Sequence, residues 1–239
     1  MSEDTVLDRS RSVYGHDAVA ARLAAEILSG ARPPGSRMPS AEQLFERFGV
    51  SRVLVREVAK TLTAKGLIAG KSRVGTVVLP PSAWNWFDSD LLTWRVSVGL
   101  DQEFLRHLAQ MRYAVEPAAA ALAAEQHQAV HIHSMRQALS DMALAGSDRR
   151  AFGEADLAFH IAIALGSGNP LFRSFAGVVE TALRAFLGLT TPLDAFAMAQ
   201  TVATHARIAD AIEQRDAAGA ALAMKAVIDE GYDRVKGTM

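Results

Sequence analysis

The chain from about Gly99 to its last residue constrains the fold most, because it shows no alternating apolar and polar pattern and few β-branched runs. It consists instead of alanine-rich segments of helical length, which are typical of closely packed helices. We therefore expect residues 99–239 to form an all-α antiparallel helical bundle. The predicted helices span residues 102–126, broken or bent near Pro117, and residues 129–145, 148–165, 169–189, 194–214 and 216–236.

Residues 1–79 show a different pattern, in which glycine and proline separate short segments. Apolar residues at helical spacing predict a first helix over residues 17–28, and Gly30 follows where such a helix would end. Serine is a favoured N-cap residue because its side chain accepts a backbone N–H at the helix start. We therefore expect Ser40 to begin a second helix that runs through Phe48, and Ser51 to begin a third that ends at Lys65 and Gly66.

A basic hairpin is expected after the third helix. Its strands are predicted at residues 67–69 and 76–79, with a turn between Gly70 and Gly75. Two short helices joined at Gly49 and followed by a hairpin are typical of a winged helix-turn-helix, whose second helix enters the major groove of DNA. The predicted fold class is mainly α, with a winged helix-turn-helix over residues 1–79 and a helical bundle over residues 99–239.

Charge is distributed unevenly along the chain. Residues 31–80 hold nine Lys and Arg residues against three Asp and Glu residues, a balance of +6, whereas the whole chain carries a net charge of −1. Localised positive charge favours a surface that contacts nucleic acid, because neutralised phosphates release their condensed counterions. Solvated charges on a helix are the alternative, and the predicted winged helix-turn-helix favours the first interpretation.

Composition narrows the class of protein further. The chain has 239 residues, half of them hydrophobic, which is enough for a substantial core. It contains no cysteine, which excludes disulfides, thiolate zinc sites and a cysteine nucleophile. The first fifteen residues lack the apolar core of a signal peptide, and no later segment is long and apolar enough to span a membrane. We expect a cytoplasmic protein that does not enter the membrane.

Residues 80–98 are expected to link the two domains. Pro80 and Pro81 stiffen the start of this segment, since each proline fixes its own backbone and restricts the residue before it. All three tryptophans of the chain follow within eleven residues, at positions 84, 86 and 94. A nucleic-acid stacking platform is one interpretation, but two aspartates lie among the aromatic rings, and this segment contains no Lys or Arg before Arg95. Packing of the linker between domains or subunits is the favoured interpretation.

Several polar residues lie among apolar neighbours in the predicted bundle. Asp156 and His160 are four residues apart and therefore project from one face of a helix, where they could share a cation. His205 lies close to an apolar stripe on a later helix, and Thr201 precedes it by one turn on the same face. A surface Asp–His pair is the alternative to a metal site. Arg112 on a largely apolar helix needs an anion, and Glu116 one turn later is a local candidate.

The first part of the chain resembles the operator-binding domain of GntR-type transcriptional regulators. The resemblance rests on four blocks: Pro34 to Ser40, Val50-Ser51-Arg52-x-x-Val55-Arg56-Glu57, Gly66-Leu67-Ile68 and Gly75-Thr76-x-Val78. It implies that Arg52 and Arg56 approach bases or phosphates, and that the wing around Gly75 lies against the minor groove. Ser51 could donate to a phosphate, and Lys71 and Arg73 of the wing are further DNA-binding candidates. The family usually has an acidic then a basic residue where this chain has Ala41 and Glu42.

The second part resembles the FCD ligand-binding domain of the FadR-type branch of the same family. Its matching segments are Met111-Arg112-x-x-x-Glu116-Pro117, Asp156-x-x-x-His160, Gly168-Asn169-Pro170 and the segment from His205 to Asp216. The resemblance implies a divalent metal, zinc or nickel, bound by Asp156, His160 and His205. The family usually supplies a third histidine where this chain has Val227. Either three protein ligands leave an open fourth position for water or an oxygen of the effector, or metal binding is too weak to matter and the site is simply polar. The resemblance also implies a carboxylate effector bound by Arg112, with Thr201 contacting its hydroxyls.

These expectations define a homodimeric, ligand-responsive transcriptional regulator, expected to be a repressor. A dimer would read a pseudo-palindromic operator, because one recognition helix contacts too few base pairs for useful specificity. The segment from Trp84 to Trp94 resembles the linker of galactonate-type regulators, which implies a sugar acid as effector. The alternative is a metal-dependent enzyme acting on a small carboxylate. We do not expect an enzyme, because no further general-base carboxylate is visible and the winged domain would be unexplained.

Overall fold

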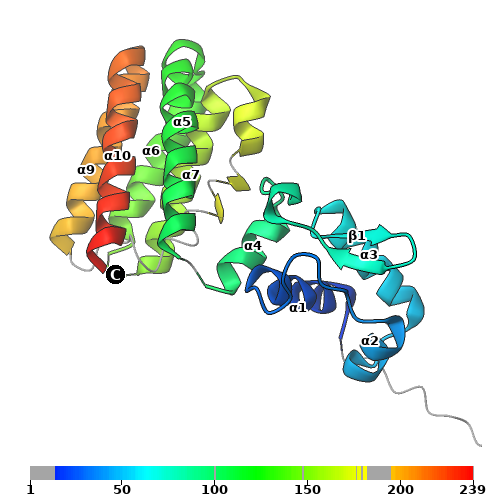
Figure 1. Ribbon diagram of the computed structural model, residues 1–239. Helices are drawn as coiled ribbons and strands as arrows, with labels where there is room; N and C mark the ends of the chain where they lie inside the picture. Colours follow the sequence, from blue (N-terminus) through cyan, green and yellow to red (C-terminus); the bar gives the residue numbers. More distant parts are fainter. Residues whose placement is uncertain are drawn as a thin grey trace, which may run out of the picture. The chain divides into compact units, whose positions relative to one another are not determined.

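The computed structural model describes residues 14–99, 101–146, 148–175, 177–178, 180–181 and 195–238 (Figure 1). The chain divides into two compact units, Met1–Gly99 and Leu100–Met239. Each unit has a hydrophobic core of its own. Among the described residues, no helix combines the length and the apolar composition that crossing a membrane requires.

The N-terminal unit begins with three helices, α1 (His16–Leu28), α2 (Ala41–Phe48) and α3 (Arg52–Ala64). The side chain of Ser40 caps α2 by accepting from the backbone N–H of Gln43, and that of Ser51 caps α3 by accepting from Leu54. Gly49 ends α2 in the left-handed conformation, with φ of 65°, which glycine adopts without a steric cost. The serines and the glycine that predicted these helix ends therefore act on the backbone next to them, by capping hydrogen bonds and by a left-handed conformation.

A two-stranded antiparallel hairpin follows, formed by β1 (Ile68–Lys71) and β2 (Gly75–Val78). In the register, Ile68 lies opposite Val78 and Lys71 lies opposite Gly75. Ile68 and Val78 are buried, so the end of the hairpin away from the turn packs in the hydrophobic core of the N-terminal unit. The turn end of the hairpin is exposed.

Residues 80–98, expected as a linker, lie within the N-terminal unit. They form the short 3₁₀ helix η1 (Pro81–Ala83) and helix α4 (Ser89–Ser97). The indole N–H groups of Trp84 and Trp86 donate to the carbonyls of Leu79 and Pro81, and the three tryptophans pack against the core of this unit. Their hydrogen bonds and packing explain a tryptophan-rich segment without a nucleic-acid role.

The C-terminal unit is a bundle of long helices. Helix α5 packs against α7 and α10, α6 packs against α7 and α9, and α9 packs against α10 (Figure 1). The helices are α5 (Gln102–Gln126), α6 (Ala129–Leu144), α7 (Arg149–Gly166), α9 (Ala195–Glu213) and α10 (Ala217–Thr238). Residues 170–175 are also helical, and residues 182–189 of the helix predicted there lie outside the described residues.

The mainly α fold class with a winged helix-turn-helix and a helical bundle is confirmed. Of the break or bend predicted near Pro117, the break does not occur: α5 continues through this residue as one helix. Pro117 removes one intrahelical hydrogen bond, but it is buried where α5 meets its neighbours. Packing along the whole length of α5 therefore outweighs the local effect of the proline.

Candidate functional site

The N-terminal unit presents the predicted DNA-binding residues on two exposed elements. Ser51, Arg52 and Arg56 lie at the start and in the first turns of α3, and all three are exposed. Arg52 and Arg56 are four residues apart, so their guanidinium groups leave the same side of the helix. A guanidinium group can bind the O6 and N7 atoms of guanine in a bidentate way.

The hairpin carries the remaining predicted DNA-binding residues. Lys71 ends β1, Arg73 lies in the turn and Gly75 begins β2, and all three are exposed. Arg73 and Gly75 both adopt positive φ, with values of 62° and 95°. This tight turn places two cations at the end of the hairpin.

Glu42 lies next to the first arginine of α3. Its carboxylate is 3.6 Å from the guanidinium group of Arg52, and both side chains are largely exposed. Local hydrogen bonds to the backbone and to Ser40, together with Arg52, lower the pKa of Glu42. A carboxylate therefore lies at the position where the resemblance leads one to expect a basic residue.

The C-terminal unit brings together Asp156 and His160 of α7 and His205 of α9. Their ligand atoms lie within 4.8 Å of one another. Asp156 Oδ1 is 2.8 Å from His205 Nε2 and 3.8 Å from His160 Nε2. Both imidazole side chains are 3% exposed or less, and Asp156 is 16% exposed. The three residues therefore form a compact, buried cluster of metal-ligating types.

The hydrogen bonding of the cluster leaves ring nitrogens without partners. His205 Nδ1 lies 2.7 Å from the carbonyl oxygen of Thr201, to which it donates, so its proton is held on the side away from Asp156. The Nε2 atoms of His205 and His160, which lie on the side of Asp156, are buried without a hydrogen bond of good geometry. A bare imidazole nitrogen facing a carboxylate oxygen is unfavourable unless a cation or proton lies between them. The donor set fits a divalent metal.

The pKa of Asp156 also favours a metal site. Burial alone would raise the pKa of this carboxyl, but contacts with His205 and His160 and the charge of Arg112 hold it below its usual range. Asp156 is therefore ionised at neutral pH, which is the form that ligates a metal.

A buried ion pair adjoins the cluster. Arg112 Nε donates to Glu116 Oε1 at 2.5 Å, and Arg112 Nη2 lies 3.3 Å from Glu116 Oε2. The same Oε2 atom is 2.7 Å from His160 Nδ1. Burial alone would raise the pKa of Glu116, but Arg112 and His160 lower it to about 2. Glu116 is therefore an anion that contacts a cation on one side and a candidate metal ligand on the other.

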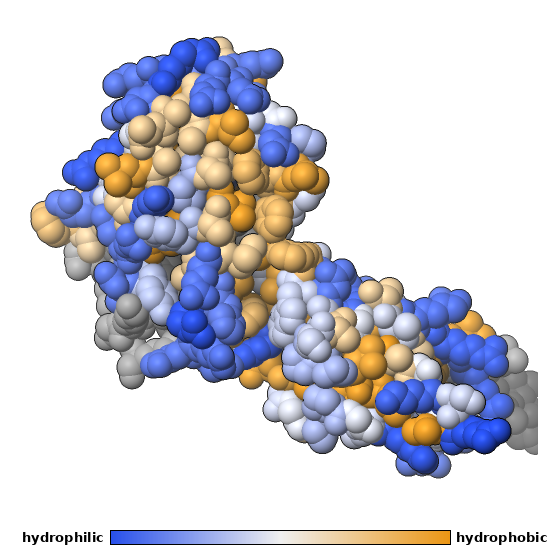
Figure 2. Space-filling view, turned by 45° about the horizontal axis from the view of Figure 1, so that its top comes forward, coloured by the Kyte–Doolittle hydropathy of each residue, from blue (hydrophilic) through white to orange (hydrophobic). Residues whose placement is uncertain are grey.

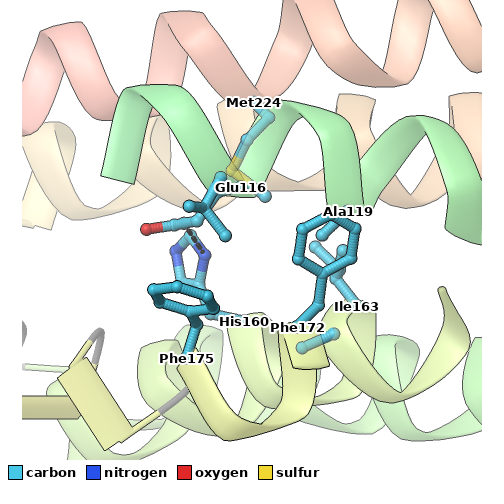
Figure 3. A pocket seen from close by; sticks show the side chains of 9 residues that line it. Glu116, Ala119, His160, Ile163, Phe172, Phe175 and Met224 are labelled. Carbon is cyan, nitrogen blue, oxygen red and sulfur yellow. Dashed lines mark ion pairs between the residues drawn. The ribbon is translucent and has the colours of Figure 1, made fainter. Parts of the chain in front are cut away.

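A small cavity opens beside Glu116 and His160 (Figure 3). Its volume is about 20 Å³, which is room for one water molecule. Phe172 and Phe175 line it from the helical segment at residues 170–175, and Met224 lines it from α10. This conformation therefore has no space at that point for a ligand larger than water.

The other predicted site residues are also in the bundle. Thr201 is buried on α9, and its hydroxyl donates to the carbonyl of Ala197 at 3.0 Å. Val227 is buried in the apolar core of the unit on α10 and can supply no ligand atom. The contact between Glu116 and His160 was not predicted, because it joins α5 to α7 and no local spacing in the sequence encodes it. The sequence pattern indicated Glu116 only as a partner for Arg112.

The fold and these two sites together define a class: a DNA-binding regulator with a winged helix-turn-helix and a separate helical domain that holds a buried polar site. Comparisons with known proteins establish the family. Residues 16–78 match the bacterial regulatory proteins of the gntR family, and residues 107–230 match the FCD domain. The chain belongs to the GntR family of transcriptional regulators and carries an FCD domain.

Curated relatives span nearly the full chain. The galactonate operon transcriptional repressor of Escherichia coli K12 is 33% identical over 220 residues, which cover 92% of this chain and 96% of the relative. The uncharacterised regulator YieP of the same organism is 35% identical over 215 residues, covering 88% and 90%. The predicted assignment as a transcriptional regulator and not an enzyme is confirmed by this family membership.

Solved structures agree on the fold. The Listeria monocytogenes protein Lar, described as controlling the agr system, matches with a TM-score of 0.67 at 17% identity, covering 95% of this chain and 99% of that protein. McbR/YncC of Escherichia coli matches with a TM-score of 0.56 at 16% identity, covering 95% and 99%. Regulators of this family bind operator DNA and a small-molecule effector, and FCD domains often bind a metal.

Proposed function

We propose that this protein is a homodimeric repressor whose operator binding responds to a small carboxylate, with a sugar acid as the effector. The observation that carries the proposal is the buried cluster of Asp156, His160 and His205 beside Arg112, in a chain that also has an operator-binding domain. Burying such charged and polar groups costs free energy unless a ligand supplies the opposite charge and the missing hydrogen bonds. A repressor of this kind acts in the cytoplasm, where the DNA is.

The DNA-binding role rests on the exposed cations of the N-terminal unit. Arg52 and Arg56 of α3 would contact bases or phosphates in the major groove, with Ser51 near a phosphate. Lys71 and Arg73, at the turn around Gly75, would contact the minor groove or its flanking phosphates. Two copies of this surface would read the two halves of a pseudo-palindrome.

The homodimer is supported by apolar side chains on the surface of the helical unit. Figure 2 shows hydrophobic areas bordered by hydrophilic side chains on its visible face. Contiguous exposed apolar areas are typical of protein interfaces. Among the described residues of this unit, the large apolar side chains exposed by more than two thirds of their surface are Leu144, Phe196, Leu222 and Leu171.

The metal would be zinc or nickel, held by Asp156, His160 and His205. Two histidines and a carboxylate suit these ions, and the unpartnered ring nitrogens support the assignment. Because Val227 supplies no ligand, a position would remain for an oxygen atom of water or of the effector. A bound metal there would supply a Lewis-acidic position for that oxygen.

The effector would bind between Arg112 and the cluster. A guanidinium group binds a carboxylate in a bidentate way, and Thr201 and the cluster residues would contact hydroxyls. The similarity to a galactonate operon repressor supports a sugar acid. Since the cavity beside Glu116 has room for only one water molecule, effector binding would require Phe172 and Phe175 to move.

Elemental analysis and calorimetry test the proposal together. The purified protein should contain close to one equivalent of zinc or nickel per chain, and His205→Ala should lose most of it. His133→Ala, which removes an exposed histidine from α6, is the matched control and should retain the metal. Galactonate and related aldonates should bind the metal-loaded protein. Equal metal content in His205→Ala and the control would remove the metal from this site, and binding of fatty acids alone would exclude a sugar acid.

A further inference from the structure

Glu116 holds two partners that belong to different parts of the candidate site. Oε1 accepts from Arg112 at 2.5 Å, and Oε2 lies 2.7 Å from His160 Nδ1. The side chains of Arg112, Glu116 and His160 are all less than 10% exposed, so water does not screen these contacts. The dashed line in Figure 3 marks the contact between Glu116 and His160.

The two histidines of the cluster share one arrangement. His205 has its Nδ1 held by the carbonyl of Thr201 and its Nε2 facing Asp156. His160 has its Nδ1 against Glu116 and its Nε2 on the side of Asp156. A metal-bound histidine usually has its outer nitrogen held by a carboxylate or a carbonyl, which orients the ring and makes the ligating nitrogen more basic. Glu116 occupies that outer position for His160.

We infer that Glu116 is a positioning residue that couples Arg112 to metal binding. The positive charge of Arg112 offsets part of the negative charge that Glu116 presents to His160. An anion that neutralises Arg112 restores the full effect of Glu116 on His160. This inference rests on the proposed metal and effector site. Arg112 also attracts Asp156, so its positive charge weakens the site for a cation in two ways. An effector carboxylate on Arg112 would relieve both effects and tighten metal binding, and by linkage the metal would tighten effector binding by the same factor.

The coupling predicts opposite effects for two neighbouring substitutions. Glu116→Gln removes the charge behind His160 and should weaken Zn²⁺ binding by about tenfold to a hundredfold. Arg112→Gln removes the positive charge that offsets the Glu116 carboxylate, so His160 experiences the full negative charge of Glu116. This variant should bind Zn²⁺ severalfold more strongly. If the Arg112–Glu116 pair only supported the fold, both substitutions would disturb the site and both would weaken Zn²⁺ binding.

The measurement is the Zn²⁺ affinity of the full-length apo-protein, obtained by competition with a chromophoric chelator near neutral pH. Glu230→Gln is the matched control, because it makes the same chemical change at a carboxylate that accepts from Thr204 and is no part of the cluster. Its affinity should equal that of the unmodified protein. Circular dichroism verifies that each variant is folded.

A double variant keeps the test decisive if Arg112→Gln does not fold, since that change leaves a buried carboxylate with less compensation. Arg112→Gln combined with Glu116→Gln buries no unpaired charge. Arg112→Gln in the Glu116→Gln background should change the Zn²⁺ affinity much less than the first substitution did, because the carboxylate through which Arg112 acts is absent. Arg112→Met provides a second form of the single substitution.

Each outcome supports or overturns the coupling of Arg112 to metal binding through Glu116. Opposite signs for the two single variants, or a clearly weaker Zn²⁺ affinity for Glu116→Gln with little further change in the double variant, support the coupling. Weaker binding in Arg112→Gln or Arg112→Met, or an unaltered affinity in Glu116→Gln, overturns it and leaves the proposed metal site standing. If the unmodified protein fails to bind Zn²⁺ while it still binds DNA, the metal site and the coupling are both wrong.

Discussion

Gly66 and Ala83 approach each other so closely that a Cβ atom on Gly66 would lie 2.1 Å from the carbonyl oxygen of Ala83. Gly66 also has φ of +74°, a conformation that favours glycine. The chain just after α3 is thereby fitted against η1, and only glycine fits at this point.

Gly66→Ala should therefore destabilise the N-terminal unit far more than a comparable glycine substitution elsewhere. Gly49 also has positive φ, +65°, but a Cβ atom on Gly49 would meet nothing within 4 Å, so Gly49→Ala should cost only about 1–2 kcal/mol. Chemical denaturation of both variants measures the free energies of unfolding. Equal losses would show that the approach of Ala83 does not matter.

Lys65 makes the stability of the same unit depend on alkaline pH. Its ammonium group lies 2.6 Å from Asp88 and 2.8 Å from Asp90, and its side chain is 8% exposed. Burial alone would lower the pKa of Lys65, but the two aspartates raise it above 10.5. A raised pKa contributes stability that is fully present below the unfolded value and is lost as pH rises through the folded value.

The free energy of unfolding should thus fall above about pH 10.5 in the unmodified protein. Lys65→Met should reduce this fall, although it is less stable at neutral pH because it leaves Asp88 without its partner. Lys60→Met removes an exposed lysine of α3, the helix that ends just before Lys65, and should follow the unmodified protein, since exposed ion pairs contribute little. Denaturation at a series of pH values measures the effect. Parallel curves for Lys65→Met and the unmodified protein would assign the alkaline transition to other groups.

Glu42 should weaken DNA binding, because its carboxylate pairs with Arg52 and repels phosphates. Glu42→Gln should modestly strengthen binding to duplex DNA at low salt, because Glu42 is largely exposed and its charge is well screened. The gain should shrink as salt is added. Glu103→Gln, which removes an exposed carboxylate from α5, serves as the control. Weaker DNA binding in Glu42→Gln would mean that Glu42 orients Arg52 for its contact.

Arg56 should contribute to sequence preference. If it contacts a base, Arg56→Ala should cost about 1–3 kcal/mol on an operator selected from random-sequence duplexes and should relax the preference at one position. A phosphate contact would instead weaken binding to all sequences alike and reduce the salt dependence. Unaltered affinity in both Arg52→Ala and Arg56→Ala, with both variants folded, would contradict the assignment of α3 as recognition helix.

Much of this architecture can be predicted from the sequence where local chemistry decides it. Ser40, Ser51 and Gly49 mark helix ends through caps and a left-handed residue, and these signals depend on a few neighbouring atoms. The spacing of Asp156 and His160 likewise predicts a shared helix face. Such features need no knowledge of how the helices pack.

Features that depend on packing could not be predicted in the same way. Pro117 favours a break by local rules, and α5 passes through it because neighbouring helices hold it along its length. The contact of Glu116 with His160 requires the rotation of α5 against α7, which no sequence spacing specifies. The tryptophans near Pro81 likewise pack within the N-terminal unit, where the carbonyls of Leu79 and Pro81 accept their N–H groups.

The decisive experiment for a ligand-responsive repressor follows operator binding by the zinc-loaded protein as galactonate is added. Fluorescence anisotropy of a labelled operator should show release. Arg112→Ala should bind the operator as tightly as the unmodified protein and should not respond, because the carboxylate has lost its guanidinium partner. If calorimetry shows that galactonate binds the unmodified protein while its operator affinity stays the same, the protein is not a repressor controlled by this ligand.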